Sequence, residues 1–466
     1  MQVLRRQLPT PEQINIVQRI QNGVSLIRGA AGSGKTSTAL TALRATTGAT
    51  VNQLRNVGAL PANVLVLTYY NTLKGYISAV AEEELADYAD SVRLFVMTFD
   101  KWAFATLGLN EAIPVLAIEN DLRMRSMALP RATNFLVDES NYVMGRFLPA
   151  DLDNYITAQR TGRGGSPQMG APMRQRLLDE VVKPHMMWKQ QSGRRSFHDV
   201  ALAMIDAVPE VRYDVIIVDE AQDLSANQLR AVMRHAAEDA IITIVTDSAQ
   251  RIYPLGAPWA EAGLHVTPNR SFRLTRNYRN TRQVAALAAS LAQGIPMDDD
   301  GSIPDPARCS RDGPVPVLLH GKFSRQLNFV MDRLQQIDTE NETVGFLHLK
   351  GGGWFDDIRA ALDMAGLDYC ELQGAAVWPE DGSNIGLCTF HSAKGLEFDH
   401  VFVIGLAQSQ ASYGDQPDDD RYNALRRLLA MGVGRARQTV TLGAKPGEAL
   451  EVLSIIDPGT IQEIVL

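Results

Sequence analysis

Short hydrophobic runs recur along the chain and alternate with longer stretches of helical periodicity. In the first half these runs lie at residues 23–28, 63–69, 92–98, 214–218 and 241–246. A second series lies at 315–319, 344–349, 385–390, 401–406 and 439–442. Buried strands that alternate with helices are typical of parallel sheets covered on both faces. The pattern therefore predicts an α/β fold with two doubly wound parallel sheets.

The strand pattern stops between about residues 104 and 195, where the sequence becomes helical and rich in arginine. We interpret this stretch as a helical subdomain inserted into the first α/β domain. The predicted boundaries are 1–104 and 196–268 for the first domain, 105–195 for the insertion and 269–466 for the second domain.

Composition narrows the class of protein. The chain has 466 residues, of which 45% are hydrophobic and 21% charged, as in ordinary globular proteins. It contains no uncharged apolar run of about 18 residues, so we expect a cytoplasmic protein with no membrane partner. Cys309, Cys370 and Cys388 lie far apart in sequence and are expected to be packing residues. The formal charge of −8 argues against a protein that coats nucleic acid, but it allows a local basic groove.

Residues 29–36 read GAAGSGKT, directly after a predicted strand and before a predicted helix. This is the context of a phosphate-binding loop, in which glycines let backbone N–H groups approach phosphate oxygens. Lys35 would reach the β- and γ-phosphates, and the Thr36 hydroxyl would bind Mg²⁺. The alternative is a glycine-rich turn without a ligand. The candidate ATP-binding residues of the loop are Gly29, Gly32, Gly34, Lys35 and Thr36.

An acidic pair follows the predicted strand in VIIVDEAQD, at residues 215–223. Ligands of open α/β sheets bind at the carboxyl ends of strands, where Asp219 and Glu220 lie. Asp219 would hold Mg²⁺ through water, and Glu220 would orient and deprotonate the attacking water. Taken alone, the pair could equally be a solvated strand cap.

Two arginines in the second half are candidates to neutralise charge on the γ-phosphate. They are Arg279 in LTRNYRN and Arg435 in GVGRAR. Supplied from the second sheet, they would make hydrolysis depend on closure between the two domains. Each could alternatively be a solvated surface arginine.

The segment Thr10–Gln13 has the pattern of a helix capping box, with threonine as the cap and glutamine three residues later. The Gln13 amide could be that cap partner, or it could read the edge of adenine upstream of the phosphate loop. The sequence leaves both roles open.

Taken in order, these motifs resemble the UvrD, Rep and PcrA branch of superfamily 1 helicases. The resemblance covers nearly the whole chain. Besides the motifs above, it rests on LTYYNTLKGY at 67–76, VMTFDKWA at 96–103, TDSAQRIY at 246–253, TFHSAKGLEF at 389–398 and RRLLAMGVGRAR at 426–437. It implies two RecA-like domains that hydrolyse ATP and drive a helicase or translocase along single-stranded DNA, or into a tailed duplex, with 3′ to 5′ polarity.

The resemblance also implies roles for further residues. Gln250 would sense the γ-phosphate, Tyr278 would stack on adenine, and Glu397 would contact the ribose. The positions that line the single-strand path in the family correspond to Tyr69, Thr98, Phe99, His391 and Lys394. Tyr69 and Phe99 could instead be packing residues at strand ends.

The sequence departs from the family in three places. No tryptophan directly follows the Gln250 motif, and Trp259 is the nearest one. Ser37 and Gly434 replace an arginine and a threonine that are common in the family. Only about 110 residues separate Arg279 from Cys388, too few for the large mobile domain that full-size members insert there. We therefore expect a compact form that lacks this domain.

The sequence also allows alternatives to a DNA motor that acts without a partner protein. The compact size resembles the helicase-like subunit of Gabija-type phage-defence pairs, so the chain could be a regulatory or sensor ATPase with a nuclease partner. RNA is a further candidate substrate, because backbone tracking and stacking discriminate weakly between sugars.

Overall fold

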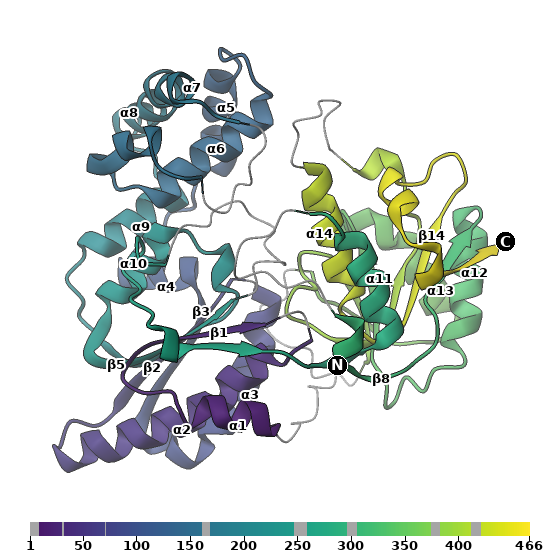
Figure 1. The fold of residues 1–466 in the computed structure, drawn as a ribbon, viewed down its shortest axis with the longest axis horizontal. Helices are drawn as coiled ribbons and strands as arrows, with labels where there is room; N and C mark the ends of the chain where they lie inside the picture. The colour runs from purple at the N-terminus through teal and green to yellow at the C-terminus, as the bar shows by residue number, and fades with distance from the viewer. Residues whose placement is uncertain are drawn as a thin grey trace.

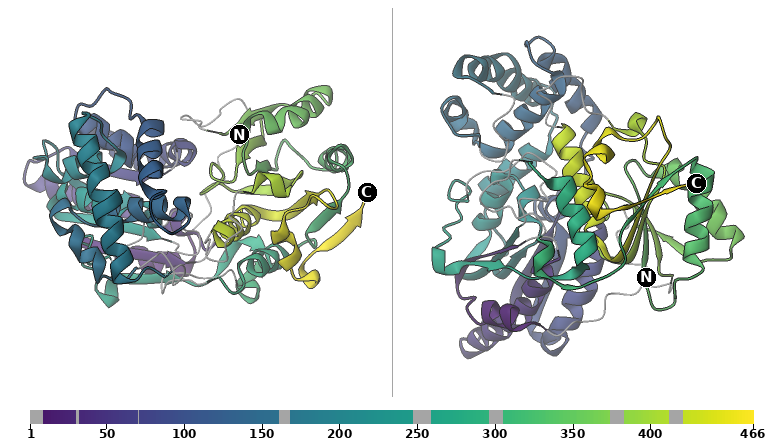
Figure 2. Two further views of the ribbon diagram at one scale, coloured as in Figure 1. Left: turned by 90° about the horizontal axis from the view of Figure 1, so that it is seen from above. Right: turned by 45° about the vertical axis from the view of Figure 1, so that its right-hand side comes forward.

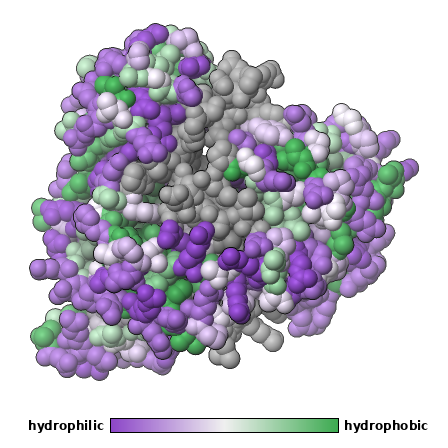
Figure 3. All heavy atoms as spheres, in the orientation of Figure 1, coloured by the Kyte–Doolittle hydropathy of each residue, from purple (hydrophilic) through white to green (hydrophobic). Residues whose placement is uncertain are grey.

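The computed structural model describes residues 9–29, 32–69, 71–160, 168–246, 259–295, 305–373, 383–411 and 421–466. These residues form two α/β lobes that lie side by side, with a group of helices above the first lobe (Figures 1 and 2). The side chains on the visible face of both lobes are mainly hydrophilic (Figure 3). In the part of the chain that the structure describes, no helix has the length and apolar character needed to cross a membrane.

The first lobe is built on a six-stranded parallel sheet with the order β3-β2-β4-β5-β1-β6. Its strands are β1 (Gly23–Gly29), β2 (Ala62–Thr68), β3 (Val92–Thr98), β4 (Tyr213–Val218), β5 (Ala236–Thr246) and β6 (Ser271–Leu274). Helices α1 (Pro11–Val17), α2 (Lys35–Asn56) and α3 (Asn71–Leu85) pack on one face, and α4 (Phe99–Thr106), α9 (Phe197–Asp206) and α10 (Ala226–Arg234) pack on the other.

The alternation of side chains along the strands explains this three-layer arrangement. Val64 and Val66 of β2 belong to the core beneath α2, whereas Leu65 and Leu67 belong to the core on the opposite face. Successive side chains of a strand point to opposite faces, so a continuous apolar run buries both. The five strands predicted in the first half are therefore confirmed.

The predicted boundary at residue 268 is wrong. Strand β6 pairs in parallel with β1, with Leu26 opposite Ser271, so the first sheet extends to Leu274. Its four residues follow a short 3-10 turn at Pro268–Arg270, and a run this short carries no readable periodicity.

The helices above the first lobe correspond to the predicted insertion. They are α5 (Val115–Ser126), α6 (Thr133–Arg146), α7 (Ala171–Arg176), a π-helical segment (Leu177–Val182) and α8 (Lys183–Gln191). They share one hydrophobic core, which includes Leu136, Val143 and Val181. Arg146 of α6 joins this core to the first lobe, because its guanidinium donates to both carboxylate oxygens of Glu261 at 2.7 Å.

The second lobe contains a seven-stranded parallel sheet with the order β11-β12-β10-β13-β14-β9-β15. Its strands are β9 (Val317–His320), β10 (Val344–His348), β11 (Tyr369–Glu371), β12 (Ile385–Thr389), β13 (Phe398–Val403), β14 (Ala436–Ala444) and β15 (Gln462–Val465). Helices α11 (Arg282–Ala292) and α14 (Arg421–Val433) cover one face, and α12 (Phe323–Leu334) and α13 (Asp356–Met364) cover the other. The prediction of two parallel α/β sheets is thus confirmed.

A two-stranded sheet, β7 (Asn277–Thr281) and β8 (Cys309–Arg311), lies next to α11. Cys309, Cys370 and Cys388 form no disulfide bond with one another and are buried, as expected for packing residues.

Candidate nucleotide and nucleic-acid sites

The candidate phosphate-binding loop, residues 29–36, joins β1 to α2 as predicted. Strand β1 ends at Gly29, and α2 begins at Lys35, directly after Gly34. Gly34 and Gly32 have φ angles of 80° and 79°, a region that favours glycine. The Lys35 ammonium donates to the Gly29 carbonyl at 2.6 Å, so it lies across the loop. The N-terminus of the 22-residue helix α2 faces this loop, and no side chain caps it.

Gln13 contacts the loop from α1. Its Oε1 accepts from the Thr10 amide at 2.8 Å, and the Thr10 hydroxyl accepts from the Gln13 amide at 3.3 Å, so the predicted capping box is confirmed. The same side chain donates through Nε2 to the Gly34 carbonyl at 3.2 Å. Gln13 therefore fixes the helix start and touches the phosphate-binding loop, while its adenine-reading role stays a prediction.

Asp219 lies one residue beyond β4 and faces the start of α2. The Thr36 hydroxyl donates to its Oδ2 at 3.0 Å. Its Oδ1 is buried and has no hydrogen-bond partner among the described residues. Burial and the neighbouring Glu220 carboxylate raise the pKa of Asp219 above its ordinary value.

These observations fit a magnesium site. A divalent cation would satisfy the buried oxygen and stabilise the charged carboxylate of Asp219. Within the described ranges no cluster of three or more His, Cys, Asp or Glu side chains could hold a metal by itself. The remaining ligands would therefore come from phosphate oxygens and water, as is usual for Mg²⁺ bound with a nucleotide.

Glu220 has an unusual backbone. Of the described residues other than glycine, it alone has a positive φ, at 54°. Such a conformation costs about 1 kcal/mol or more and is common at functional sites. Its carboxylate accepts from the Gln222 amide and lies 3.4 Å from the Lys394 ammonium. Burial alone would raise the pKa of Glu220, but Lys394, Arg435 and Lys35 together hold it below the ordinary value. The Glu220 side chain is therefore ionised, and only the ionised form can accept a proton.

The NYRN segment of β7 presses directly against the phosphate-binding loop. The backbone amides of Tyr278 and Arg279 donate to the Gly32 carbonyl at 3.0 and 3.3 Å. A Cβ atom added to Gly32 would lie 2.3 Å from the Asn277 Oδ1, so only glycine fits at this contact. Tyr278 is partly exposed beside the loop, which suits its predicted contact with adenine.

Two buried asparagines organise this segment, and sequence reasoning missed both. Asn277 donates to Asn280 at 2.9 Å, and its Oδ1 accepts from the Arg279 and Asn280 amides at 3.1 Å. Asn280 in turn donates to the Gly434 carbonyl at 3.0 Å, next to Arg435. The signal was present in the sequence, because asparagine stands at both ends of NYRN.

Both candidate arginines lie in the region where the two lobes meet, which we call the seam. Arg279 forms an ion pair with Glu397, and its Nε is buried without a partner in the described part of the chain. Burial raises the pKa of Glu397, but Arg279, Arg437 and Arg435 hold it below the ordinary value. The predicted ribose contact of Glu397 therefore competes with its ion pair.

Arg435 is almost completely buried, at 1% exposure, and its Nε donates to the Met431 carbonyl at 3.1 Å. It is close enough to lower the pKa of Glu220. The structure thus brings Lys35, Asp219 and Glu220 together with Arg435. Gln250 lies outside the described residues.

The structure places Lys394 away from its predicted position on the single-strand path. It was predicted to line the single-strand path, but its side chain is fully buried and forms an ion pair with Asp223 of the first lobe. Burial lowers the pKa of Lys394, while Asp223 and Glu220 together raise it above the ordinary value. The assignment is corrected, because the opposed carboxylates fix this ammonium between the lobes.

We expect Lys394→Met to lower the free energy of unfolding by about 3 kcal/mol, since two buried carboxylates would lose their cation. Urea unfolding followed by circular dichroism measures the change. The exposed Lys350→Met is the matched control. Adding Asp223→Leu should recover part of the loss, because a buried apolar pair tolerates the lost charges. Unchanged stability in Lys394→Met would contradict this role.

The other predicted nucleic-acid residues divide into two groups. Phe99 is 2% exposed and packs edge-on against Trp102, with ring centroids 5.6 Å apart. The buried Thr98 hydroxyl accepts from the Lys101 amide at 3.4 Å and caps α4. Both are corrected to structural roles. Tyr69 and His391 are partly exposed, and their contact with nucleic acid stays a prediction.

Comparison with known proteins gives two family matches. The UvrD/REP helicase N-terminal domain matches residues 175–258, and the UvrD-like helicase C-terminal domain matches residues 333–444.

Similar proteins carry related names. A "Probable DNA helicase" of Mycoplasma pneumoniae is 25% identical over 245 residues, which are 49% of this chain and 42% of that protein. DNA helicase II of Escherichia coli is 38% identical over 86 residues, 18% of this chain and 11% of that protein. The chain therefore spans less than half the length of these relatives. A solved C-terminal domain of a possible DNA helicase from a Lactobacillus shares 21% identity over 40% of this chain and 98% of that one, with a TM-score of 0.29, too low to support an argument.

Proposed function

We propose that this chain, which carries the N-terminal and C-terminal domains of UvrD-like helicases, is an ATP-driven motor that moves along single-stranded DNA with 3′ to 5′ polarity. The main support for the proposal is the set of contacts between the two lobes at the seam. The candidate phosphate-binding loop and the acidic pair of the first lobe contact NYRN and Lys394, and Arg435 of the second lobe is near enough to lower the pKa of Glu220.

The residues of the two lobes have different roles in the proposed hydrolysis of ATP. Lys35 and the backbone of the loop hold the β- and γ-phosphates of ATP, and Thr36 and Asp219 hold Mg²⁺. The cation, when bound, neutralises charge on the phosphates. Glu220, an ionised carboxylate next to Asp219, accepts a proton from the attacking water. Arg435 neutralises the charge that develops on the γ-phosphate.

Movement would follow from the contacts that cross the seam. Lys394 binds Asp223 and approaches Glu220, and Tyr278 binds Gly32, so the lobes meet at the residues that would hold ATP. A triphosphate that enters must rearrange these contacts, and hydrolysis would restore them. Such a cycle converts nucleotide state into relative motion of the lobes. The names of the relatives favour DNA as the track.

The ATPase rate with and without an oligothymidylate tests the proposal. We expect the single strand to raise the rate about tenfold, because a motor couples hydrolysis to its track. Lys35→Ala is the control and should be inactive in both conditions. Duplexes with a 3′ or a 5′ tail test polarity. A rate that no single strand changes would contradict the motor and favour a regulatory ATPase, which a nuclease partner would then have to stimulate.

A further inference from the structure

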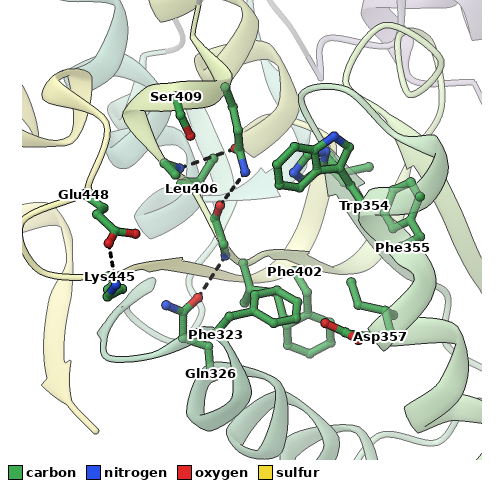
Figure 4. A pocket seen from close by; sticks show the side chains of 18 residues that line it. Phe323, Gln326, Trp354, Phe355, Asp357, Phe402, Leu406, Ser409, Lys445 and Glu448 are labelled. Carbon is green, nitrogen blue, oxygen red and sulfur yellow. Dashed lines mark hydrogen bonds and ion pairs between the residues drawn. The ribbon is translucent and has the colours of Figure 1, made fainter.

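The second lobe contains a pocket that the nucleotide site does not use. It has a volume of about 370 Å³, and residues at or just beyond the carboxyl ends of β10 and β13 belong to its lining; Figure 4 shows the lining side chains. Its walls are mainly apolar and aromatic. They include Phe323, Trp354, Phe355, Phe402 and Leu406. Ligands of open α/β sheets bind at this edge, and apolar pockets of this size hold small organic groups.

Trp354 is the most unusual residue of the pocket. It is 48% exposed, although tryptophan is usually well buried. Its indole stacks on the His348 imidazole, with ring centroids 5.1 Å apart and an interplanar angle of 19°. It follows Gly351 and Gly352, whose φ angles of 66° and 63° favour glycine. The loop therefore presents a half-exposed aromatic ring that is stacked on His348.

His348 supports the indole as a neutral ring. The backbone amides of Lys350 and Gly351 donate to its Nδ1 at 3.0 and 3.1 Å. Burial and the nearby Lys350 lower the pKa of His348 to about 4. The imidazole thus adds an uncharged stacking surface beneath Trp354.

The pocket adjoins the segment that contains His391, one of the two partly exposed nucleic-acid candidates. Strand β10 pairs with β12, and the Phe390 amide donates to the His348 carbonyl at 3.1 Å. His391 follows directly. A Cβ atom on Gly351 would lie 2.6 Å from the Thr389 methyl, so the Trp354 loop and the His391 segment are in close contact.

We propose that this pocket holds one unstacked base of the single strand, which packs on the indole of Trp354. The inference rests on the proposed function and adds a base-binding site in the second lobe. A nucleobase fits better than an anionic ligand, because most of the lining is apolar, the lining carboxylate of Asp357 would repel an anion, and the lining cation Lys445 is paired with Glu448.

The amides in the walls predict little base selectivity. Gln326 binds the Gly321 carbonyl at 2.7 Å and the Gly405 amide at 2.9 Å. Gln410 binds the Gly405 carbonyl at 2.9 Å and the Ala407 amide at 3.4 Å. One N–H and the oxygen of each amide are engaged within the protein, so we expect stacking to contribute more than base-specific hydrogen bonds.

The test compares Trp354→Ala with wild type, using fluorescence anisotropy of a labelled oligothymidylate. We expect the affinity of Trp354→Ala to fall about fivefold or more, as for loss of a base-stacking aromatic. Trp354→Phe should stay within about twofold of wild type, because an aromatic face remains. ATPase without DNA should be unchanged in both variants.

The chain supplies a matched control in Trp188, which also stacks on a histidine, His185, with ring centroids 5.8 Å apart. Trp188→Ala should leave DNA affinity unchanged. A strand that carries 5-iodouracil should crosslink on irradiation to the peptide that contains Trp354. If Trp354→Ala binds the strand as wild type does, or loses no more affinity than Trp188→Ala, the pocket does not bind a base. The proposed motor function is not contradicted by that result. If wild type binds no single strand, both proposals fail.

Discussion

Replacing Glu220 by glutamine is expected to lower ATP turnover at least about 100-fold while nucleotide affinity stays within a few-fold of wild type. Glutamine keeps the shape of the side chain but cannot accept a proton from water. Lys394 keeps its ion pair with Asp223 in this variant, so the contact between the lobes should persist. Steady-state ATPase and the affinity for a fluorescent ATP analogue measure the two effects.

The exposed Glu238→Gln is the control for loss of one negative charge on the same lobe and should leave both quantities unchanged. Turnover near the wild-type rate in Glu220→Gln would show that another group activates the water. A parallel loss of affinity and turnover would instead indicate that Glu220 mainly shapes the loop.

Arg435→Ala is expected to reduce the rate of the hydrolysis step by about tenfold or more, with nucleotide binding largely retained, because removal of an arginine finger commonly costs about 10³ to 10⁵ in rate. In the proposed site Arg435 belongs to the second lobe, so it is expected to reach the reacting phosphate only when the lobes close around ATP. Single-turnover hydrolysis separates this step from nucleotide binding.

Because Arg435 is buried, truncation could also disturb packing. Arg435→Lys keeps the charge and should recover part of the rate, which a role limited to packing does not predict. The exposed Arg333→Ala, in the last turn of α12, is the matched control for loss of one arginine. If binding and hydrolysis fall together in Arg435→Ala, the residue is structural.

Local sequence patterns predicted much of the fold and of the nucleotide site. The phosphate-binding loop is a continuous strand, glycine loop and helix, and Asp219 directly follows a strand, so each depends on neighbours in sequence. The two parallel sheets followed in the same way from the apolar runs. The proximity of Arg435 to Glu220 joins residues that are far apart in sequence, and the sequence offered Arg435 only as one of two candidate partners of the γ-phosphate.

The errors concern residues whose environment comes from distant parts of the chain. Lys394 lies in a motif where a cation is easily interpreted as a phosphate contact, but Asp223 of the other lobe buries it. Phe99 follows a strand as Tyr69 does, and only tertiary packing distinguishes the buried ring from the partly exposed one. The Trp354 pocket was not predicted, because strands and loops that are distant in sequence build its walls.

The most direct test of the seam is a crystal structure with a non-hydrolysable ATP analogue and magnesium. We expect the triphosphate on Lys35, the cation between Thr36 and Asp219, and the Arg435 guanidinium moved from the Met431 carbonyl to the γ-phosphate. A nucleotide held by the first lobe alone, with Arg435 still bound to Met431, would contradict a triphosphate gripped by both lobes.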